Sequence, residues 1–240
     1  MTPGIYSTVS ALTARWSEQE KAAENLSGAN TIAHKRQIVG YGSFNKVLHS
    51  TGGPQQSTAQ SLPYAQTATS DWSSGPMKLT SGKLDAAIAG PGFFQVQTPS
   101  GVQLTRDGHF SINSDKQLVN DAGFPVIGSH GPITVTGDAS LEPDGAVIQN
   151  GRTTDRLAMV AVDHPEKLQT VGGGLFSLGS ATAKPTAGKI APGYLEMSNV
   201  DVPTEMASMI QNQRMYDMLT RAFQAQDEGI GKAIQDLSGT

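Results

Sequence analysis

Apolar residues near the end of the chain recur at alternating steps of four and three, the pattern of a helix that packs along one narrow seam on another helix. The series lies in the C-terminal segment 199–240, in an expected helix from Asp201 to Leu237, and is interrupted by the polar residues Gln213, Thr220 and Asp227. Its apolar members are Val202, Met206, Met209, Tyr216, Phe223, Ile230, Ile234 and Leu237. A helix of this length extends about 55 Å. We therefore expect it to need a helical partner.

The first segment of the chain has the same spacing and supplies that partner. Its apolar positions include Ile5, Val9, Leu12, Trp16 and Leu26. Pro3 suits a first helical turn and Gly28 suits a helix stop. We predict that the two ends pair as a coiled coil through these two rows, which together we call the predicted seam. The alternative is a pair of surface helices on a common core, but the strict period of the longer row favours the coiled coil.

Between the helices the pattern changes to short strand-like runs bounded by Gly and Pro. Such runs fill residues 84–179, where Asp107-Gly108 and Asp144-Gly145 are signals for hairpin turns. The stretch 37–83 is polar and rich in Gly, Pro, Ser and Thr, so we expect an extended arm, with disorder in the free monomer as the alternative.

The fold class predicted from these patterns is α+β. Long N- and C-terminal helices form a coiled coil, and a β-rich middle domain of short strands projects from it. The expected divisions are an N-terminal helix with a following motif (1–36), an extended polar arm (37–83), the β-rich domain (84–179), a return connection (180–198) and the C-terminal helix (199–240).

Composition excludes several classes of function. The chain has 17 basic and 21 acidic residues and no basic cluster, which argues against binding of nucleic acid. It has no Cys, so neither disulfides nor thiolate chemistry are available. No apolar run approaches the roughly 18 residues of a membrane span. The first residues lack the pattern of an ordinary secretory signal, so we expect any export to use another route.

Candidate catalytic groups do not form a recognisable set. The His residues are scattered, and none has a partner at the helical spacing of metal ligands. Gly90-Pro91-Gly92 lacks the features of a phosphate loop, and Asp107 and Asp144 each precede Gly in an expected turn. We therefore expect a protein that is not an enzyme and that uses no cofactor or metal.

The residues that follow the first helix resemble the signature of bacterial flagellar axial proteins, N-N-L-A-N-x-x-T-x-G-[FY]-K-R. The matching residues are Asn25, Leu26, Asn30, Thr31, Lys35 and Arg36. Glu24 replaces the first Asn, Gly28-Ala29 departs from the middle, and Ala33-His34 replaces the Gly-aromatic pair.

Further family patterns follow in order. Residues 84–96, 105–110 and 123–126 resemble L-D-V-A-I-x-G-x-G-F-F-x-V, T-R-x-G-x-F and G-x-P-V, and 193–200 resembles G-x-L-E-x-S-N-V. Residues 206–216 resemble the helix M-x-x-M-I-x-x-Q-R-x-[YF]. Motif residues in these stretches are Gly92, Phe93, Phe94, Thr105, Arg106, Gly108, Ser198, Asn199, Gln213 and Arg214.

The resemblance implies a structural subunit of the flagellar basal-body rod, which polymerises through its terminal helices into the drive shaft between motor and hook. It implies partners among copies of itself, other rod proteins and the flagellar type III export apparatus. The implied location is the rod in the periplasmic space, reached without a cleaved signal peptide. Residues 131–135 favour the proximal rod type. The alternatives are a distal rod protein or, from another class, a β-domain ligand-binding module dimerised by its helices.

Overall fold

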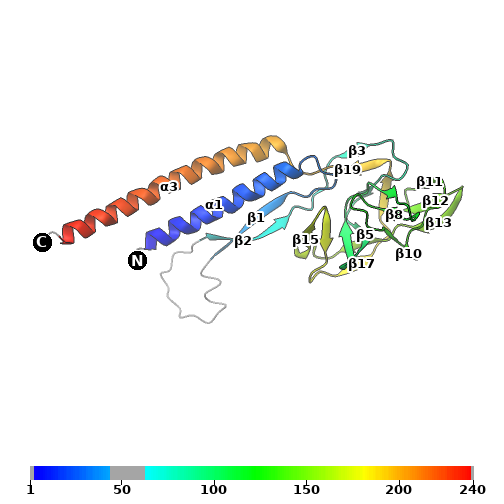
Figure 1. Ribbon diagram of the computed structural model, residues 1–240, viewed down its shortest axis with the longest axis horizontal. Helices are drawn as coiled ribbons and strands as arrows, with labels where there is room; N and C mark the ends of the chain where they lie inside the picture. Colours follow the sequence, from blue (N-terminus) through cyan, green and yellow to red (C-terminus); the bar gives the residue numbers. More distant parts are fainter. Residues whose placement is uncertain (1–2, 44–62, 239–240) are drawn as a thin grey trace. The chain divides into compact units, whose positions relative to one another are not determined.

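The chain forms two compact units in the computed structural model, which describes residues 3–43 and 63–238 (Figure 1). The helix unit comprises the described residues of 1–27, 37–71 and 201–240, and the β unit comprises 28–36 and 72–200. The α-helices of the described chain are α1 (Pro3–Gly28) and α3 (Val202–Ser238). No helix among the described residues combines the length and apolarity needed to cross a membrane.

The helix unit contains a β-hairpin beside its two helices. Strand β1 (Gln37–Ser43) pairs antiparallel with β2 (Pro63–Ser70), from Gln37 opposite Ser70 to Ser43 opposite Pro63. The buried Asn25 of α1 binds the start of this hairpin, because its side-chain amide donates to the Gln37 carbonyl at 3.0 Å and accepts from the Gln37 N–H at 2.7 Å. Part of the stretch expected as an extended arm is therefore a hairpin, and the expectation for 44–62 lies outside the described residues.

The prediction that the terminal helices form a coiled coil is wrong, although the two helices and the β-rich middle are present. The described buried side chains of α1 are Thr8, Ala14, Ala22 and Asn25; none belongs to the predicted seam, and most lie one residue before a position of that row. In α3 the buried Glu205 lies one residue before Met206, whereas the half-buried positions include Ser208, Asn212, Met215 and Leu219 as well as the seam residues Val202, Met209 and Phe223. One residue corresponds to about 100° of rotation around a helix.

Polar contacts explain this rotation. Arg15 of α1 donates to the side-chain oxygen of Asn212 in α3 at 3.3 Å and also pairs with Glu18 at 2.6 Å. Polar side chains thus occupy the side of α1 that meets α3, and an apolar row turned toward the same place would displace them. The predicted seam positions Ile5, Ile230, Ile234 and Leu237 lie on these helices but outside the described side chains.

The β unit is built from short antiparallel strands. Its largest sheet has six strands in the order β15-β16-β6-β5-β14-β17. These strands are β15 (Gln169–Gly172), β16 (Leu175–Ser177), β6 (Gly101–Thr105), β5 (Phe93–Thr98), β14 (Met159–Val162) and β17 (Ala183–Pro185). The central pair β5 and β6 is a hairpin with Phe94 opposite Thr105 and Thr98 opposite Gly101.

Smaller sheets complete the β unit. They pair β3 (Met77–Leu79) with β19 (Tyr194–Glu196), β4 (Ala86–Ala89) with β18 (Lys189–Pro192), β7 (Ser111–Ile112) with β8 (Leu118–Val119), and β9 (Ile127–Gly128) with β10 (Gly131–Pro132). A three-stranded sheet contains β11 (Ala139–Leu141), β12 (Ala146–Gln149) and β13 (Arg152–Arg156). One 3-10 turn, η1 (Pro165–Lys167), follows β14. Strands β17, β18 and β19 lie in the stretch expected as a return connection.

The centre of the six-stranded sheet is buried on both faces, and side chains along β5 alternate between them. Phe94 and Val96 belong to the larger core, where the Phe94 ring packs edge-on against Phe110 with centroids 5.2 Å apart. Phe93 belongs to a second cluster with Leu104, Val160 and Phe176. Both aromatic residues of the Phe93-Phe94 pair are therefore core residues, on opposite faces of one strand.

The two Asp-Gly pairs have different structures. Asp144-Gly145 lies in the turn between β11 and β12, as predicted, and Gly145 has a positive φ of 82°. The prediction of a hairpin at Asp107-Gly108 is wrong, because these residues lie in the loop between β6 and β7. Gly108 passes so close to β4 that a Cβ there would be 1.6 Å from the Ala86 carbonyl oxygen. Close packing therefore requires this glycine.

The segment 28–36 belongs to the β unit and contains an unusual backbone conformation. Ala33 has a φ of 56° and is 1% exposed, and its N–H donates to the Glu196 carbonyl at 2.8 Å. This is the position at which the resembled family pattern has Gly. A residue with a Cβ is strained by about 1–2 kcal/mol in the left-handed region. Ala33 is therefore strained, whereas a glycine at this position would not be.

Ala33→Gly should stabilise the β unit by about 1 kcal/mol, because relief of the strain exceeds the entropic cost of glycine and the loss of one buried methyl group. Thermal melting of the full chain, followed on the β-unit transition, measures the change. Ala187→Gly is the matched control, since Ala187 is exposed and is not among the residues with positive φ. A lower melting temperature in both variants would contradict the strain.

Candidate assembly site

A buried carboxylate, that of Glu196 in β19, holds three segments of the β unit together. Its Oε1 accepts from the Lys35 Nζ at 2.7 Å and from the Gly75 N–H at 3.0 Å, and its Oε2 accepts from the Arg106 Nη1 at 3.3 Å. The side chains of Lys35, Glu196 and Arg106 are 0%, 1% and 5% exposed. Removing any one of these charged side chains is costly, because its partners would be left buried without a compensating charge.

Asn199 joins the same segments by a second set of bonds. Its Oδ1 accepts from the Arg36 N–H at 2.8 Å, and its Nδ2 donates to the carbonyl and the hydroxyl of Ser73 at 3.1 and 3.0 Å. The Lys35 Nζ also donates to the Ser73 carbonyl, at 2.8 Å. These residues lie beside the points where the chain passes between the two units, after 27, 36, 71 and 200. Within the β unit, the connecting segments are thus fixed to one another.

The structure therefore brings together some of the sequence-predicted motif residues and separates others. Lys35, Arg36, Arg106 and Asn199 meet at this buried group, which we call the junction. Thr105 lies next to it and donates its hydroxyl to the Gly174 carbonyl at 2.9 Å, and Ser198 accepts from the Val200 N–H at 3.2 Å. Asn30 and Thr31 are exposed.

The remaining motif residues have other surroundings. Gly92, Phe93, Phe94 and Gly108 are buried by the packing of the β unit, Asn25 is buried in the helix unit, and Leu26 is half-buried. Gln213 and Arg214 are exposed on α3. The residues of the family patterns thus lie in at least three kinds of surroundings: a charged junction, a packed core and an open helix surface.

Sequence reasoning missed two residues of the β unit. Glu196 carries the junction; it is the E of the pattern G-x-L-E-x-S-N-V, but the sequence did not indicate that it is buried and paired with two cations. Trp72 packs edge-on against Phe93 and Phe176, with centroids 5.2 and 4.8 Å apart. The signal available for Glu196 was its place at the fixed acidic position of that family pattern.

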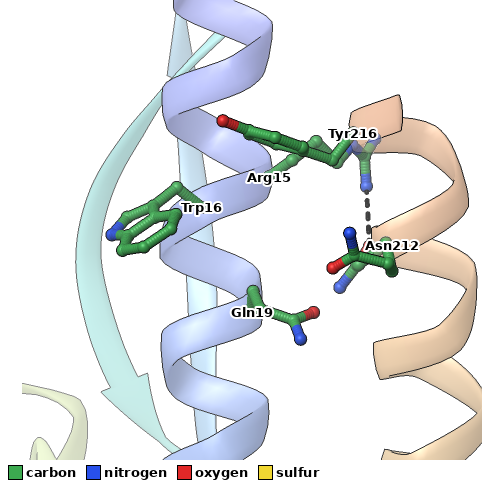
Figure 2. A pocket seen from close by; sticks show the side chains of 6 residues that line it. Arg15, Trp16, Gln19, Asn212 and Tyr216 are labelled. Carbon is green, nitrogen blue, oxygen red and sulfur yellow. Dashed lines mark hydrogen bonds between the residues drawn. The ribbon is translucent and has the colours of Figure 1, made fainter. Parts of the chain in front are cut away.

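The helix unit has a small polar pocket between α1 and α3, of about 160 Å³. Figure 2 shows Gln19 directed toward α3, Tyr216 reaching across toward α1, and Arg15 bonded to Asn212. Trp16 points away from α3 in the same view. Trp16 also lines the pocket, but it is 66% exposed, so much of its aromatic surface is open to other contacts.

Large apolar side chains of the predicted seam are exposed on both helices. Val9 and Trp16 are 46% and 66% exposed on α1, and Met206 and Tyr216 are 51% and 37% exposed on α3. Leu12, Val202, Met209 and Phe223 are half-buried. Exposed apolar side chains that recur along a helix are typical of a protein–protein contact surface.

A second group of ionisable side chains surrounds the loop between β6 and β7. The His109 Nδ1 lies 2.8 Å from Asp85 Oδ1, and the His109 N–H donates to Asp107 Oδ1 at 2.9 Å. Burial raises the pKa of Asp107 to about 6. Burial lowers the pKa of His109, but the hydrogen bond to Asp85 and the charges of Asp121, Asp85 and Asp107 outweigh it, so this pKa is raised.

Comparisons with known proteins agree in the kind of protein that they find. Residues 191–236 match the family model described as flagellar basal body rod FlgEFG protein C-terminal, and residues 87–153 match flagellar hook protein FlgE/F/G D1 domain. The second match covers much of the β unit, and the first contains Glu196 and most of α3.

Whole-chain relatives carry names of the same kind. The flagellar basal-body rod protein FlgF of Salmonella typhimurium is 30% identical, with 99% of both chains covered. FlgF of Caulobacter vibrioides is 34% identical over 70% of this chain and 71% of the relative. The flagellar basal-body rod protein FlgG of Buchnera aphidicola is 28% identical, with 98% of this chain and 100% of the relative covered.

Removing the shared carboxylate should destabilise the β unit strongly. Glu196→Gln leaves the buried Arg106 and Lys35 side chains without their anionic partner, and we expect a loss of about 3–5 kcal/mol in unfolding free energy. Denaturant unfolding of the full chain measures it. The matched control is Asp138→Asn, which removes an exposed ion pair with Lys83 at 2.9 Å and should cost about 0–1 kcal/mol. Equal losses would show that burial does not matter here.

Stability of the β unit should fall as pH rises from about 4 to about 6, because the pKa of Asp107 is raised on folding and its protonated form is the more stable one when buried. The raised pKa of His109 has the same sign and extends the decline above pH 6.5. The Asp107 shift alone corresponds to at most about 3 kcal/mol.

Chemical unfolding of the chain at several pH values tests this dependence. Asp107→Asn should flatten the decline between pH 4 and 6, whereas Asp115→Asn, at an exposed residue, should leave it unchanged. The expected dependence is absent if wild-type stability is constant or rises over this range.

Proposed function

Because this chain belongs to the flagellar basal-body rod protein family and is a structural subunit of that rod, we propose that it polymerises through the exposed apolar sides of α1 and α3. The observation that supports this proposal is the exposure of Val9, Trp16, Met206 and Tyr216 in the single chain. Each of these side chains would lose its contact with water when a neighbouring subunit packs against it.

The polymer is open rather than closed in this proposal. A contact between different surfaces on successive subunits generates a helical filament when the rotation does not close. The two helices present separate exposed rows, one on α1 and one on α3, which suits contacts to more than one neighbour. Such a filament serves as the drive shaft that transmits motor torque to the hook.

The partners are further copies of this chain and other rod proteins. The chain reaches the rod through the flagellar type III export apparatus and works in the periplasmic space. We assign it to the proximal rod because of residues 131–135, where β10 leads into the buried residues Ile133 and Val135. Relatives named FlgF and relatives named FlgG both match the chain, so the distal rod is the alternative.

Trp16→Ala and Met206→Ala should each weaken polymerisation, because truncation removes about 1–3 kcal/mol of apolar burial at every subunit contact. That range corresponds to roughly 5-fold to 150-fold in the critical concentration. Sedimentation velocity over a concentration series measures self-association, and incorporation into flagella of a strain that lacks the wild-type gene measures assembly in the cell.

The matched control is Ala207→Gln, at an exposed position of α3 outside the predicted seam, which should polymerise normally. The melting temperature of the β unit should not change in any of the three variants. An association that stops at a dimer would instead favour a dimerised ligand-binding module, and unaltered polymerisation of both truncated variants would reject the proposed surface.

A further inference from the structure

A pocket of about 320 Å³ in the β unit has no part in the helix surface described above. It is lined by Trp72, Ser73 and Ser74, by the loop of residues 90–92, and by Phe93, Arg106, Val162 and Pro165. The pocket therefore joins the aromatic cluster on one face of the six-stranded sheet to one of the cations of the junction.

Two N–H donors at this pocket have no acceptor among the described residues. The Nε of Arg106 is buried and unbonded, although Nη1 of the same guanidinium contacts Glu196 Oε2 at 3.3 Å. The indole Nε1 of Trp72 is likewise buried and unbonded. A buried donor without an acceptor costs about 1–3 kcal/mol, so two beside one pocket indicate a site that is incomplete in the isolated chain.

The aromatic cluster holds both donors in place. The Trp72 ring packs edge-on against Phe93 and Phe176, and the Arg106 guanidinium lies over the Phe93 ring, 5.2 Å from its centroid. The Arg106 side chain is 5% exposed. Neither group can turn into bulk solvent without disrupting this packing, so both donors stay beside the pocket.

The chemistry of the walls defines that guest. It must supply hydrogen-bond acceptors and is favoured by negative charge, since one of the donors belongs to a guanidinium. The aromatic rings, Val162 and Pro165 suit a short apolar stem behind the acceptors. A phosphate dianion suits the site less well, because Arg106 already shares its charge with Glu196 and no other pocket residue is cationic.

We propose that this pocket binds a carboxylate group on a short apolar stem, with the Arg106 Nε–H and the Trp72 Nε1–H as donors. Two sources offer this chemistry: an acidic side chain of a neighbouring copy of this chain, or a small soluble carboxylic acid. The first source rests on the proposed polymerisation, and the second does not.

The test follows the indole N–H resonance of Trp72 by NMR in the full chain, at concentrations below those at which it polymerises. Trp16→Phe assigns the two indole resonances. Propionate should shift the Trp72 resonance saturably, whereas propionamide, which has the same shape without the charge, should shift it little. A shift with inorganic phosphate as large as that with propionate would overturn the assignment to a carboxylate.

Ser74→Phe fills the mouth of the pocket from an exposed position and should abolish the response to propionate. Ser100→Phe, at an exposed position outside the pocket lining, is the matched control and should keep it. Equal melting temperatures of the two variants show that neither has simply unfolded. An unchanged response in Ser74→Phe would place the binding elsewhere and overturn the proposal.

A dilution series without added acid separates the two sources. If a neighbouring copy supplies the carboxylate, the Trp72 resonance moves with protein concentration and propionate competes with that movement. If a soluble acid is the guest, only added propionate moves it. A resonance that responds to neither rejects the pocket, while self-association through α1 and α3 can still be observed by sedimentation.

Discussion

The β unit depends on one buried carboxylate, that of Glu196, which Lys35 and Arg106 share. A buried charge is stable only when its partners are fixed, so the three segments that carry these residues must be placed together whenever the unit is folded. Asn199 adds neutral hydrogen bonds to the same segments. As a result, residues 33–36, 73–75 and 196–199, together with Arg106, are joined within the β unit, beside points where the chain passes to the helix unit. For a subunit of a shaft, connecting segments fixed in this way are a physical basis for stiffness.

The helix unit is held together differently from the β unit. Its intrachain contact is polar, through Arg15 and Asn212, and its apolar rows are turned away from that contact by one helical position. A single chain that buried these rows against one another would leave little apolar surface for neighbours. Exposing Trp16 and Met206 costs the monomer solvation free energy, but it keeps their contact area for assembly. In the proposed function, the β unit and the exposed helix rows thus divide two tasks, folding and polymerisation, between two parts of one chain.

Local chemistry at two positions shows how far this chain departs from its family pattern. Ala33 adopts a left-handed conformation where the pattern has Gly, and the strain persists because Ala33 is buried and bonded to Glu196. Asp107 and His109 occupy the two variable positions of the pattern T-R-x-G-x-F. They lie beside Asp85, and the raised pKa values of Asp107 and His109 couple stability to pH at a place that the pattern leaves open.

The sequence by itself determined the two terminal helices, the short strands between them, the turn at Asp144-Gly145 and the flagellar rod family, because periodicity and motif order are local properties. It could not determine which side of each helix would be enclosed. The apolar row predicts a packing surface, but the partner of that surface depends on the polar pair Arg15 and Asn212, whose residues are 197 positions apart. Tertiary structure alone also decided the junction, because Lys35 and Glu196 become an ion pair only when strand β19 lies beside residues 28–36. It likewise decided the role of Gly108, because the atom that excludes a side chain there is a backbone carbonyl of another strand, β4.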